Sequence, residues 1–489
     1  MKPTSATVLE IFEEICQIPR PSKHEEQIRQ YLLQFASTHQ LAAQTDSAGN
    51  VLITKNGNTP GICLQAHMDM VCEKTPETRH DFLKDPIRHT VEDGWMHACG
   101  TTLGADDGIG MALALAALLS DSPLRLEALF TVDEETGLTG ANALQAGWIQ
   151  SPVLLNLDSE EDDEFIIGCA GGCETVARYT VKRSPLPIGM FGVKLKIKGL
   201  RGGHSGSDIH LHRANALLLL SRFLQAEAQK FEVRVVALSG GNLHNAIARE
   251  AEAFIAVPMR QKEQIRIDWN IYWSEQEDLW LADEPQMLGE LESATLPNEA
   301  LDEALGQALT DALAGCRHGV VAWSTQLPDI VETSTNLASV KPLTLTDEPE
   351  DGSEAVTHEF IEVCTSQRSS DEAELSRLAF EIYEHFSAHG AQPYITGKYS
   401  GWAPNFDSPL VSQAVGAYSR LFGQAPAVKV IHAGLECGVF RQIMPQLDML
   451  SVGPTLRDVH TPSERLKIES VGKIWRLIGE LIQYSSATV

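Results

Sequence analysis

Basic residues are scarce in this sequence of 489 residues. It has 38 lysines and arginines against 66 aspartates and glutamates, which gives a formal net charge of −28 with histidine neutral. A chain with this charge repels phosphate backbones and anionic lipid headgroups. The composition therefore argues against nucleic acid and against a membrane surface as partners.

Long apolar runs are also lacking. The most apolar stretch, GIGMALALAALL at residues 108–119, is shorter than the roughly 18 residues that a membrane-spanning helix needs. The first residues, MKPTSATVLEIFEEI, show no apolar core followed by a small-residue cleavage site, so no secretory signal is apparent. The nine cysteines are an odd number without C-x-x-C pairs, which favours reduced thiols. We expect a cytoplasmic protein.

Helix and strand patterns alternate over residues 1–185. Short apolar runs are closed by polar or glycine residues, and they lie at 51–53, 62–65, 126–132 and 153–157. The helical stretch 108–119 lies between two of them. Such alternation predicts an α/β domain whose mixed, mostly parallel sheet is covered on both faces. The same pattern returns in residues 397–489, which we expect to complete this domain.

The middle of the chain, residues 186–396, has a different pattern. The segment FGVKLKIKGL at 191–200 alternates apolar and polar residues, as a half-exposed strand does. Further helices and strands follow, and the segment 279–312 is acidic and helical in pattern. We therefore predict an inserted α+β domain.

Side chains that can bind metal follow the predicted parallel strands. Because the carboxyl ends of such strands form the ligand crevice of an open sheet, these side chains are expected to converge there. Two more acidic residues lie in the loop LGADDGIG, just before a predicted helix. The candidates in chain order are His67, Asp69, Asp106, Asp107, Glu134, Glu135, Asp158, Asp458 and His460.

Two histidines with several carboxylates and no thiolate suit Zn²⁺, Mn²⁺ or Co²⁺. A carboxylate between two such ions can bridge them, and a trapped water then loses its proton near neutral pH. The adjacent Glu134 and Glu135 have diverging side chains, so one can bind metal while the other acts as general base. Asp69 is placed to accept a hydrogen bond from the His67 imidazole and fix its tautomer.

Several motifs in this order resemble those of the dinuclear-metal M20 peptidase family, and within it most closely the bacterial aminoacyl-histidine dipeptidases. The resemblance extends from the first helix to the last and is weakest over residues 260–315. The motifs are LQAHMDMV, GTTLGADDGIGMA, TVDEETGLTGA, LLNLDSEE, GCAGG, GGHSG, HAGLECG and SVGPTLRDVHTPSERL.

The resemblance implies two metal ions per chain, Zn²⁺ with Co²⁺ or Mn²⁺ as alternatives. One ion would be held by His67, Asp106 and Asp158. The other would be held by Asp106, Glu135 and His460, so that Asp106 is the bridge. Asp106 is preferred to Asp107 because relatives place the bridging carboxylate first in this turn. Glu134 matches the general base, and Asp69 matches the residue that orients the first histidine.

The resemblance further implies that the inserted domain is a lid that contributes substrate contacts. His204 in GGHSG matches a histidine that stabilises the oxyanion, often across a dimer. Asn245 matches an asparagine that contacts substrate, although Ala248 stands where relatives commonly have proline. Arg368 matches an arginine that binds a substrate carboxylate, with a surface salt bridge as the alternative. Glu436 in HAGLECG is assigned to the substrate's α-amine on electrostatic grounds.

The expected activity is hydrolysis of dipeptides with a free N-terminus, including Xaa-His dipeptides such as carnosine, by a homodimer. Two alternatives stay open at this point. One is another M20-type hydrolase, such as an aminoacylase, desuccinylase or carboxypeptidase. The other is a catalytically silent protein that binds metal or peptide, although such a protein would not need Glu134.

Overall fold

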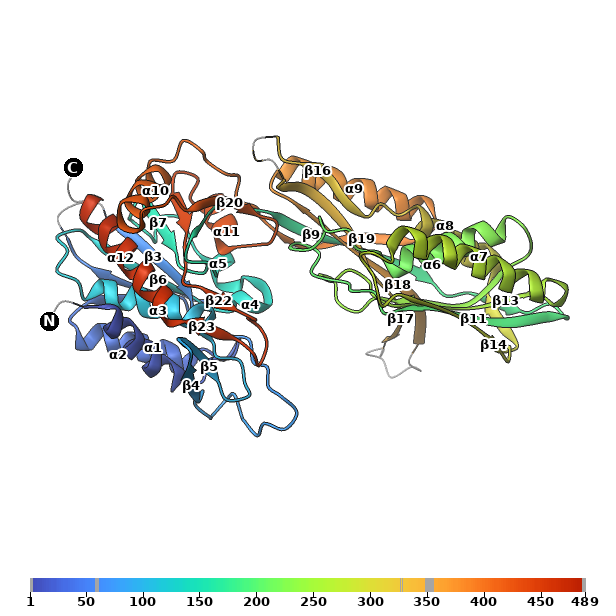
Figure 1. Cartoon of the computed structure of the whole chain (residues 1–489), viewed down its shortest axis with the longest axis horizontal. Coiled ribbons are helices and arrows are strands. Elements are labelled where there is room, and N and C mark those ends of the chain that lie inside the picture. Colours follow the sequence, from blue (N-terminus) through green and yellow to red (C-terminus); the bar gives the residue numbers. More distant parts are fainter. Residues whose placement is uncertain (1–2, 58–60, 326, 328, 348–355, 486–489) are drawn as a thin grey trace. The chain divides into compact units, whose positions relative to one another are not determined.

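The computed structural model describes residues 3–57, 61–325, 327, 329–347 and 356–485. These residues form two compact units, each described by itself below (Figure 1). The first unit contains the described residues of Met1–Cys169, Trp402–Val430 and Leu435–Val489. The second contains those of Ala170–Gly401 and Ile431–Gly434.

An eight-stranded sheet forms the centre of the first unit, in the order β1-β2-β6-β3-β7-β21-β8-β20. Its four middle strands pair in parallel; they are β6 (Leu126–Thr131), β3 (Ile62–His67), β7 (Val153–Asn156) and β21 (Asp448–Ser451). All residues of β3 and β6 are buried, as expected for strands covered on both faces. Antiparallel pairs flank this centre; the outer strands are β1 (Ala42–Thr45), β2 (Val51–Lys55), β8 (Glu164–Cys169) and β20 (Ala427–Ile431).

Helix α3 (Ala105–Leu118) packs on β3 and β6, and α1 (Ser5–Cys16) and α12 (Ile468–Ser485) pack against α3 (Figure 1). Helix α3 consists mainly of small and apolar residues and is buried on all sides. A Cβ atom at Gly108 would lie 3.0 Å from the ring of Phe12 on α1, so glycine permits the close approach of these two helices. Two further helices of this unit are α2 (Glu26–Thr38) and α10 (Pro409–Phe422).

A small four-stranded sheet joins the C-terminal segment to residues 89–98. Its strands, in spatial order, are β22 (Leu456–Arg457), β23 (Arg465–Lys467), β5 (Trp95–Ala98) and β4 (His89–Glu92). Strands β22 and β23 form an antiparallel hairpin. The turn of this hairpin contains His460, so the small sheet fixes where that histidine can lie.

The second unit is built on a nine-stranded sheet. The main path is β14-β11-β13-β12-β17-β18-β9-β19, and β16 pairs with β17. Its apolar core includes the aromatic side chains of Phe223, Trp269 and Phe386. The strands are β9 (Gly171–Thr180), β11 (Met190–Lys198), β12 (Arg234–Gly240), β13 (Ala251–Pro258), β14 (Leu288–Ala294), β16 (Gly319–Trp323), β17 (Val331–Asp347), β18 (Val356–Ser369) and β19 (Gln392–Tyr399). The helices are α6 (Ala216–Ala228), α7 (Lys262–Trp280), α8 (Glu303–Gly315) and α9 (Glu372–Ala388).

The helical pattern predicted for residues 279–312 is wrong in its middle. Residues Leu288–Ala294 form the edge strand β14, which pairs with Gly192–Lys198 of β11. Acidic residues such as Glu290 and Glu292 suit an edge strand, because charge there discourages pairing with another chain. The composition of this segment is therefore compatible with a helix and with an edge strand, and its pairing with β11 makes it a strand.

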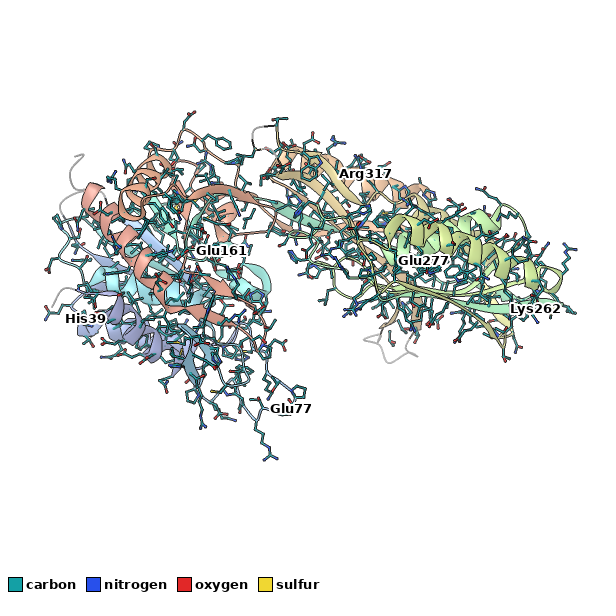
Figure 2. All side chains as sticks on the ribbon, in the orientation of Figure 1. His39, Glu77, Glu161, Lys262, Glu277 and Arg317 are labelled. Carbon is teal, nitrogen blue, oxygen red and sulfur yellow. The ribbon has the colours of Figure 1, made fainter. Side chains whose placement is uncertain are left out.

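The predicted fold class is confirmed. One unit has a mixed sheet with a parallel centre, and the sequence of the α+β unit is inserted between the chain segments that form it. Exposed charged side chains such as Glu77 and Arg317 project from the ribbon (Figure 2). Among the residues described above, no helix has the length and apolar content that crossing a membrane requires.

Candidate metal centre and active site

The five side chains predicted to bind metal converge at one edge of the parallel strands in the first unit. His67 is the last residue of β3, and Asp158 follows β7 by two residues. Glu135 lies in the short helix α4 (Glu134–Gly137), which begins three residues after the end of β6, and Asp106 lies in the first turn of α3. The strand ends thus bring together residues that are far apart in the sequence.

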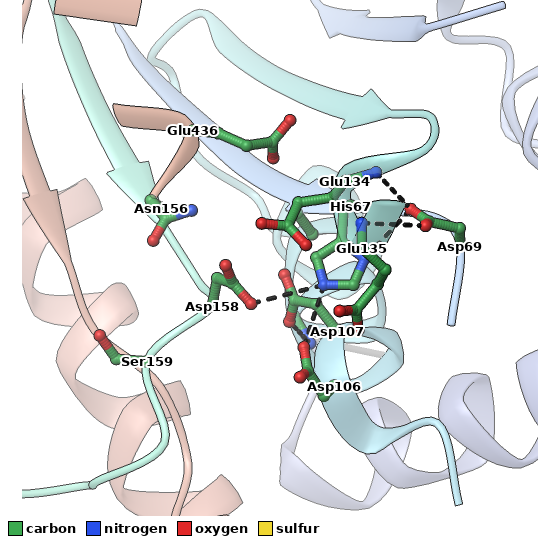
Figure 3. Close-up of polar contacts among 12 residues, drawn as sticks. His67, Asp69, Asp106, Asp107, Glu134, Glu135, Asn156, Asp158, Ser159 and Glu436 are labelled. Atoms are coloured by element: carbon green, nitrogen blue, oxygen red, sulfur yellow. Dashed lines mark hydrogen bonds and ion pairs between the residues drawn. The ribbon is translucent and has the colours of Figure 1, made fainter. Parts of the chain in front are cut away.

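The five residues form two groups that share Asp106. Figure 3 shows His67, Asp106 and Asp158 of the first group, with Glu135 of the second beside them. In the first, His67 Nε2 lies 3.0 Å from Asp106 Oδ1 and 3.5 Å from Asp158 Oδ1. In the second, His460 Nε2 lies 3.1 Å from Asp106 Oδ2 and 3.1 Å from Glu135 Oε2. The two oxygens of Asp106 therefore face different imidazoles, as a bridging carboxylate requires.

These donors fit divalent cations. Ligand atoms around a tetrahedral ion with bonds of about 2.0–2.2 Å are about 3.3 Å apart, and the imidazole–carboxylate separations in both groups are close to that value. The buried Glu135 Oε1 has no hydrogen-bond partner, which a metal ion would supply. The donors are imidazole nitrogens and carboxylate oxygens, a set that suits zinc, manganese or cobalt.

Asp107 has a different environment from Asp106. Its Oδ1 accepts a hydrogen bond from the Gly110 amide at 3.0 Å, so this carboxyl caps the regular part of α3. Burial and the nearby Asp158 carboxylate raise the pKa of Asp107 well above its usual range. The contacts thus distinguish the two adjacent aspartates: Asp106 faces both imidazoles, whereas Asp107 caps the helix.

The pKa values of the residues in the cluster are set largely by burial and by the neighbouring charged groups. Burial lowers the pKa of His67, but hydrogen bonds to carboxylates outweigh this effect and hold the pKa well above its usual range. His460 follows the same rule, with its pKa raised to about 11. Burial raises the pKa of Asp158 to about 6, despite its contact with His67. Positive charge at this place would stabilise the carboxylates together.

Asp69 supports the cluster from behind. Its Oδ1 lies 3.3 Å from His67 Nδ1, and its oxygens accept hydrogen bonds from Ser22 Oγ at 2.8 Å and from the amides of Glu134 and Glu135 at 3.1 and 3.3 Å. Burial raises the pKa of Asp69, but the contact with His67 and these donors bring it down to about 2. One carboxylate thus links the segment after β3 to the segment after β6.

Glu134 lies next to the cluster and forms a further potential ligand group with His67 and Glu135 (Figure 3). Burial, reinforced by the negative charges of Asp158, Glu135 and Glu436, raises its pKa well above the usual range. A carboxyl group in such a place can accept and return a proton near neutral pH.

Glu436 is fully buried at the start of α11 (Glu436–Ile443). Its Oε2 accepts hydrogen bonds from Gln65 Nε2 at 2.6 Å and Thr131 Oγ1 at 2.8 Å, while its Oε1 has no partner. Burial raises its pKa to about 7. Gln65 in turn accepts a hydrogen bond from Asn156, so a polar chain runs between neighbouring strands beneath the cluster.

Three predicted substrate contacts, His204, Asn245 and Arg368, belong to the second unit. His204 Nδ1 accepts hydrogen bonds from the amides of Gly206 and Ser207, which leaves the proton of a neutral ring on Nε2. The Asn245 carbonyl accepts a hydrogen bond from the Ser205 amide, so Asn245 lies beside the His204 loop.

Arg368 on β18 is only 8% exposed, and its Nη1 donates a hydrogen bond to the Tyr399 hydroxyl at 2.6 Å. Its buried Nε has no hydrogen-bond partner. A surface salt bridge is therefore not its environment. The roles assigned to the site residues of both units stay predictions.

Sequence reasoning missed several residues that build this site, among them Arg20, Gln65 and Glu464. All three are polar and buried. Gln65 could have been noticed as a polar residue inside the apolar strand ICLQAH. Glu464 lies four residues after His460, in the same motif SVGPTLRDVHTPSERL.

Comparisons with known proteins agree with this geometry. The model of Peptidase family M20/M25/M40 matches residues 63–484. The cytosol non-specific dipeptidase of Escherichia coli K12 is 38% identical over 481 residues, which cover 97% of this chain and 96% of that protein.

Solved structures give the same result. The aminoacylhistidine dipeptidase of Vibrio alginolyticus is 36% identical, with a TM-score of 0.86, 99% of this chain and 97% of that chain being covered. A tripeptidase from Staphylococcus aureus shares the fold at 16% identity and a TM-score of 0.60, with all of both chains covered. The predicted family resemblance is confirmed.

Proposed function

The chain belongs to Peptidase family M20/M25/M40, and on this premise we propose that it is a metallodipeptidase acting on dipeptides with a free N-terminus. The observation that carries the proposal is the pair of donor groups that share Asp106, with Glu134 beside them. The names of the Escherichia coli and Vibrio alginolyticus relatives support dipeptides, and the latter supports Xaa-His dipeptides, as substrates.

His67, Asp106 and Asp158 would hold one divalent ion, and Asp106, Glu135 and His460 the other. Such ions, when bound, supply the Lewis acidity that polarises a peptide carbonyl and lowers the pKa of water. Asp69 would keep the His67 ring in the orientation that turns Nε2 toward Asp106.

Glu134 would be the general base. It would take a proton from the attacking water and then deliver it to the leaving amine as the peptide bond breaks. Burial favours the neutral form of this carboxyl, which helps it to hold the proton between the two steps.

The remaining assignments concern substrate recognition. Glu436 would bind the substrate's α-amine through the oxygen that lacks a partner. In the second unit, His204 would donate from Nε2 to the oxyanion, Asn245 would contact the substrate, and Arg368 would bind its carboxylate. We further propose a cytosolic homodimer with Zn²⁺ as its metal and carnosine among its substrates.

A panel of peptides tests the proposal. Metal-stripped protein should hydrolyse none of them, and addition of Zn²⁺, Mn²⁺ or Co²⁺ should restore cleavage of Xaa-His and other dipeptides. Dipeptides with an acetylated N-terminus should be poor substrates, because Glu436 would have no amine to bind. Preference for N-acyl amino acids would instead indicate an aminoacylase, and cleavage by the metal-free protein would contradict the metal mechanism.

A further inference from the structure

The carboxylate of Glu464 is buried against the loop that leads into Asp106. Its exposed fraction is 2%, and each of its oxygens accepts two backbone hydrogen bonds. Oε2 accepts from the amides of Leu103 at 2.7 Å and Gly104 at 2.9 Å, and Oε1 from those of Ala105 at 2.7 Å and Asp106 at 3.2 Å. This one side chain therefore satisfies four consecutive amides and fixes the backbone that carries Asp106.

Glu464 also belongs to the segment that carries His460. Between the two residues the chain is folded by its own hydrogen bonds: Thr461 Oγ1 donates to the Asp458 carbonyl at 2.7 Å, and the Glu464 amide donates to the Thr461 carbonyl at 3.0 Å. Asp458 and His460 have positive φ angles of 55° and 61°, which make this turn compact. Because this stretch is short and folded by its own hydrogen bonds, fixing Glu464 also restricts where His460 can lie.

The anchor matters because packing alone does little to hold His460. Its side chain is 49% exposed, whereas that of His67 is 1% exposed. His67 lies at the end of a buried strand, and Arg20 holds the following residues: its Nη1 donates to the carbonyls of Met68 at 3.1 Å and Asp69 at 2.5 Å. The two donor groups are therefore supported in different ways.

Arg20 and Glu464 contact the Asp106 loop through different backbone groups. The guanidinium of Arg20 donates through Nη2 to the Gly104 carbonyl, while Glu464 accepts from amides of the same loop. Arg20 thereby links Asp106 to the His67 segment. Glu464 links Asp106 to the His460 segment.

We propose that Glu464 is a positioning residue for the second donor group: it holds Asp106 and His460 together and so sets the affinity of the Asp106–Glu135–His460 position for a divalent cation. The inference rests on the proposed function only in taking both groups as cation sites. Glu464 itself touches neither the cation nor the substrate. Residues that orient metal ligands in this way typically change metal affinity by about 10- to 100-fold when substituted.

The test is metal binding to the full-length chain with Glu464→Gln. The amide keeps the size of the side chain but turns an NH₂ group toward backbone N–H donors, so part of the anchor is lost. Metal-stripped protein is titrated with Zn²⁺ by calorimetry, and bound ions are counted after dialysis. We expect one site with wild-type affinity and a second weakened about 10- to 100-fold, and faster hydrogen exchange at residues 103–106.

Two further variants calibrate the result. His460→Ala removes a ligand of the second group directly and should leave one tight site, which is the limiting case for Glu464→Gln. Glu469→Gln makes the same chemical change at an exposed position five residues later and should bind two ions as the wild type does. Glu464→Asp keeps the charge on a shorter side chain and should give an intermediate affinity.

Several outcomes would overturn the inference. Binding of both ions by Glu464→Gln with unchanged affinity would contradict a role confined to the second group, and so would an equal loss of both ions. Unfolding of the Gln and Asp variants alike would make Glu464 a residue of the folding core instead. A wild-type chain that binds two ions but cleaves no dipeptide would refute the proposed function and leave the metal-binding test of Glu464 intact.

Discussion

Each unit of this chain contains a buried polar network, and the two networks differ in charge. In the first unit the buried polar groups near the strand ends are ionisable, and Asp106, Asp158 and Glu135 lie around two imidazoles. In the second unit a comparable polar group is neutral: Gln367 accepts a hydrogen bond from Thr175 and donates to Thr335 and Thr365. The neutral network is complete within the protein, whereas the charged one keeps a buried oxygen of Glu135 without a partner.

This difference indicates which of the two networks needs a ligand. A buried neutral network that satisfies its own donors and acceptors stabilises the fold and needs no ligand. A buried excess of carboxylates is stabilised when a cation enters. The properties of the charged cluster in the first unit should therefore depend on metal, while the stability of the second unit should depend on its packing.

The largest effect is expected from Glu134→Ala in the first unit. Loss of the general base should lower kcat for dipeptides by about 10²- to 10⁴-fold. The bound ions, counted by elemental analysis, should remain near two per chain.

Glu135→Ala is the matched control for that variant, because Glu135 is a predicted ligand on the neighbouring position. It should lose an ion as well as activity. If Glu134→Ala loses an ion instead, Glu134 is a ligand and the assignment of the two glutamates must be exchanged.

Phe223→Ala should give the largest effect in the second unit. Phe223 is 1% exposed and packs edge-on against Trp269, with ring centroids 4.9 Å apart. Its removal should lower the free energy of unfolding of this unit by about 3–5 kcal/mol. Hydrogen exchange measured by mass spectrometry should show lost protection in residues 170–401, with residues 62–67 and 126–131 little changed.

Phe223→Leu is the control for cavity size, and it should cost less because most of the buried volume is kept. Equal loss of protection in both units after Phe223→Ala would show that they unfold together. The contrast between a packed unit and a metal-dependent unit would then not hold for stability.

Much of the first unit was predictable, because strand ends have a fixed geometric meaning. His67, Glu135 and Asp158 each lie at or just after a parallel strand, so a prediction of the strands also places the residues. His460 was also counted among the side chains that follow a parallel strand, but its position depends on the small hairpin of β22 and β23, so the strand alone does not place it. Recognising the parallel strands was therefore sufficient for part of the site.

The remaining features could not be predicted because they depend on tertiary contacts. A glutamate in the sequence TPSER reads as a solvated acid, and only the packing of the Asp106 loop makes Glu464 a buried acceptor of four amides. Strand β14 was mistaken for helix because its acidic sequence suits either structure until β11 pairs with it. In both cases the deciding partner is more than 80 residues away in the sequence.

A smaller effect is expected from Arg368→Ala in the second unit. If Arg368 binds the substrate carboxylate, removing its charge should lower kcat/KM for dipeptides by about 10- to 100-fold, through the loss of a charged hydrogen bond worth about 1.5–3 kcal/mol. The number of bound ions should not change. Tyr399→Phe, which removes the hydroxyl that Arg368 contacts, should have a weaker effect of the same kind.

Dipeptide amides provide the control for Arg368, since they lack the carboxylate. The wild type should already cleave them slowly, and Arg368→Ala should scarcely change that rate. An equal proportional loss for dipeptides and their amides would mean that Arg368 supports the structure of β18 and does not recognise the substrate.

The smallest effect concerns the pH dependence of the second unit's stability. Burial lowers the pKa of His318 to about 4, and its Nδ1 accepts a hydrogen bond from the Leu337 amide at 3.2 Å. In the unfolded chain the pKa is about 6.5, so the unfolded state binds more protons between pH 6.5 and pH 4. The free energy of unfolding should therefore fall as the pH is lowered through this window, by about 2 kcal/mol at pH 5 from this residue. In His318→Asn the side-chain oxygen can still accept the hydrogen bond but does not titrate, so urea unfolding should show a shallower pH dependence than in the wild type. Identical pH profiles would show that His318 is not held neutral by the fold.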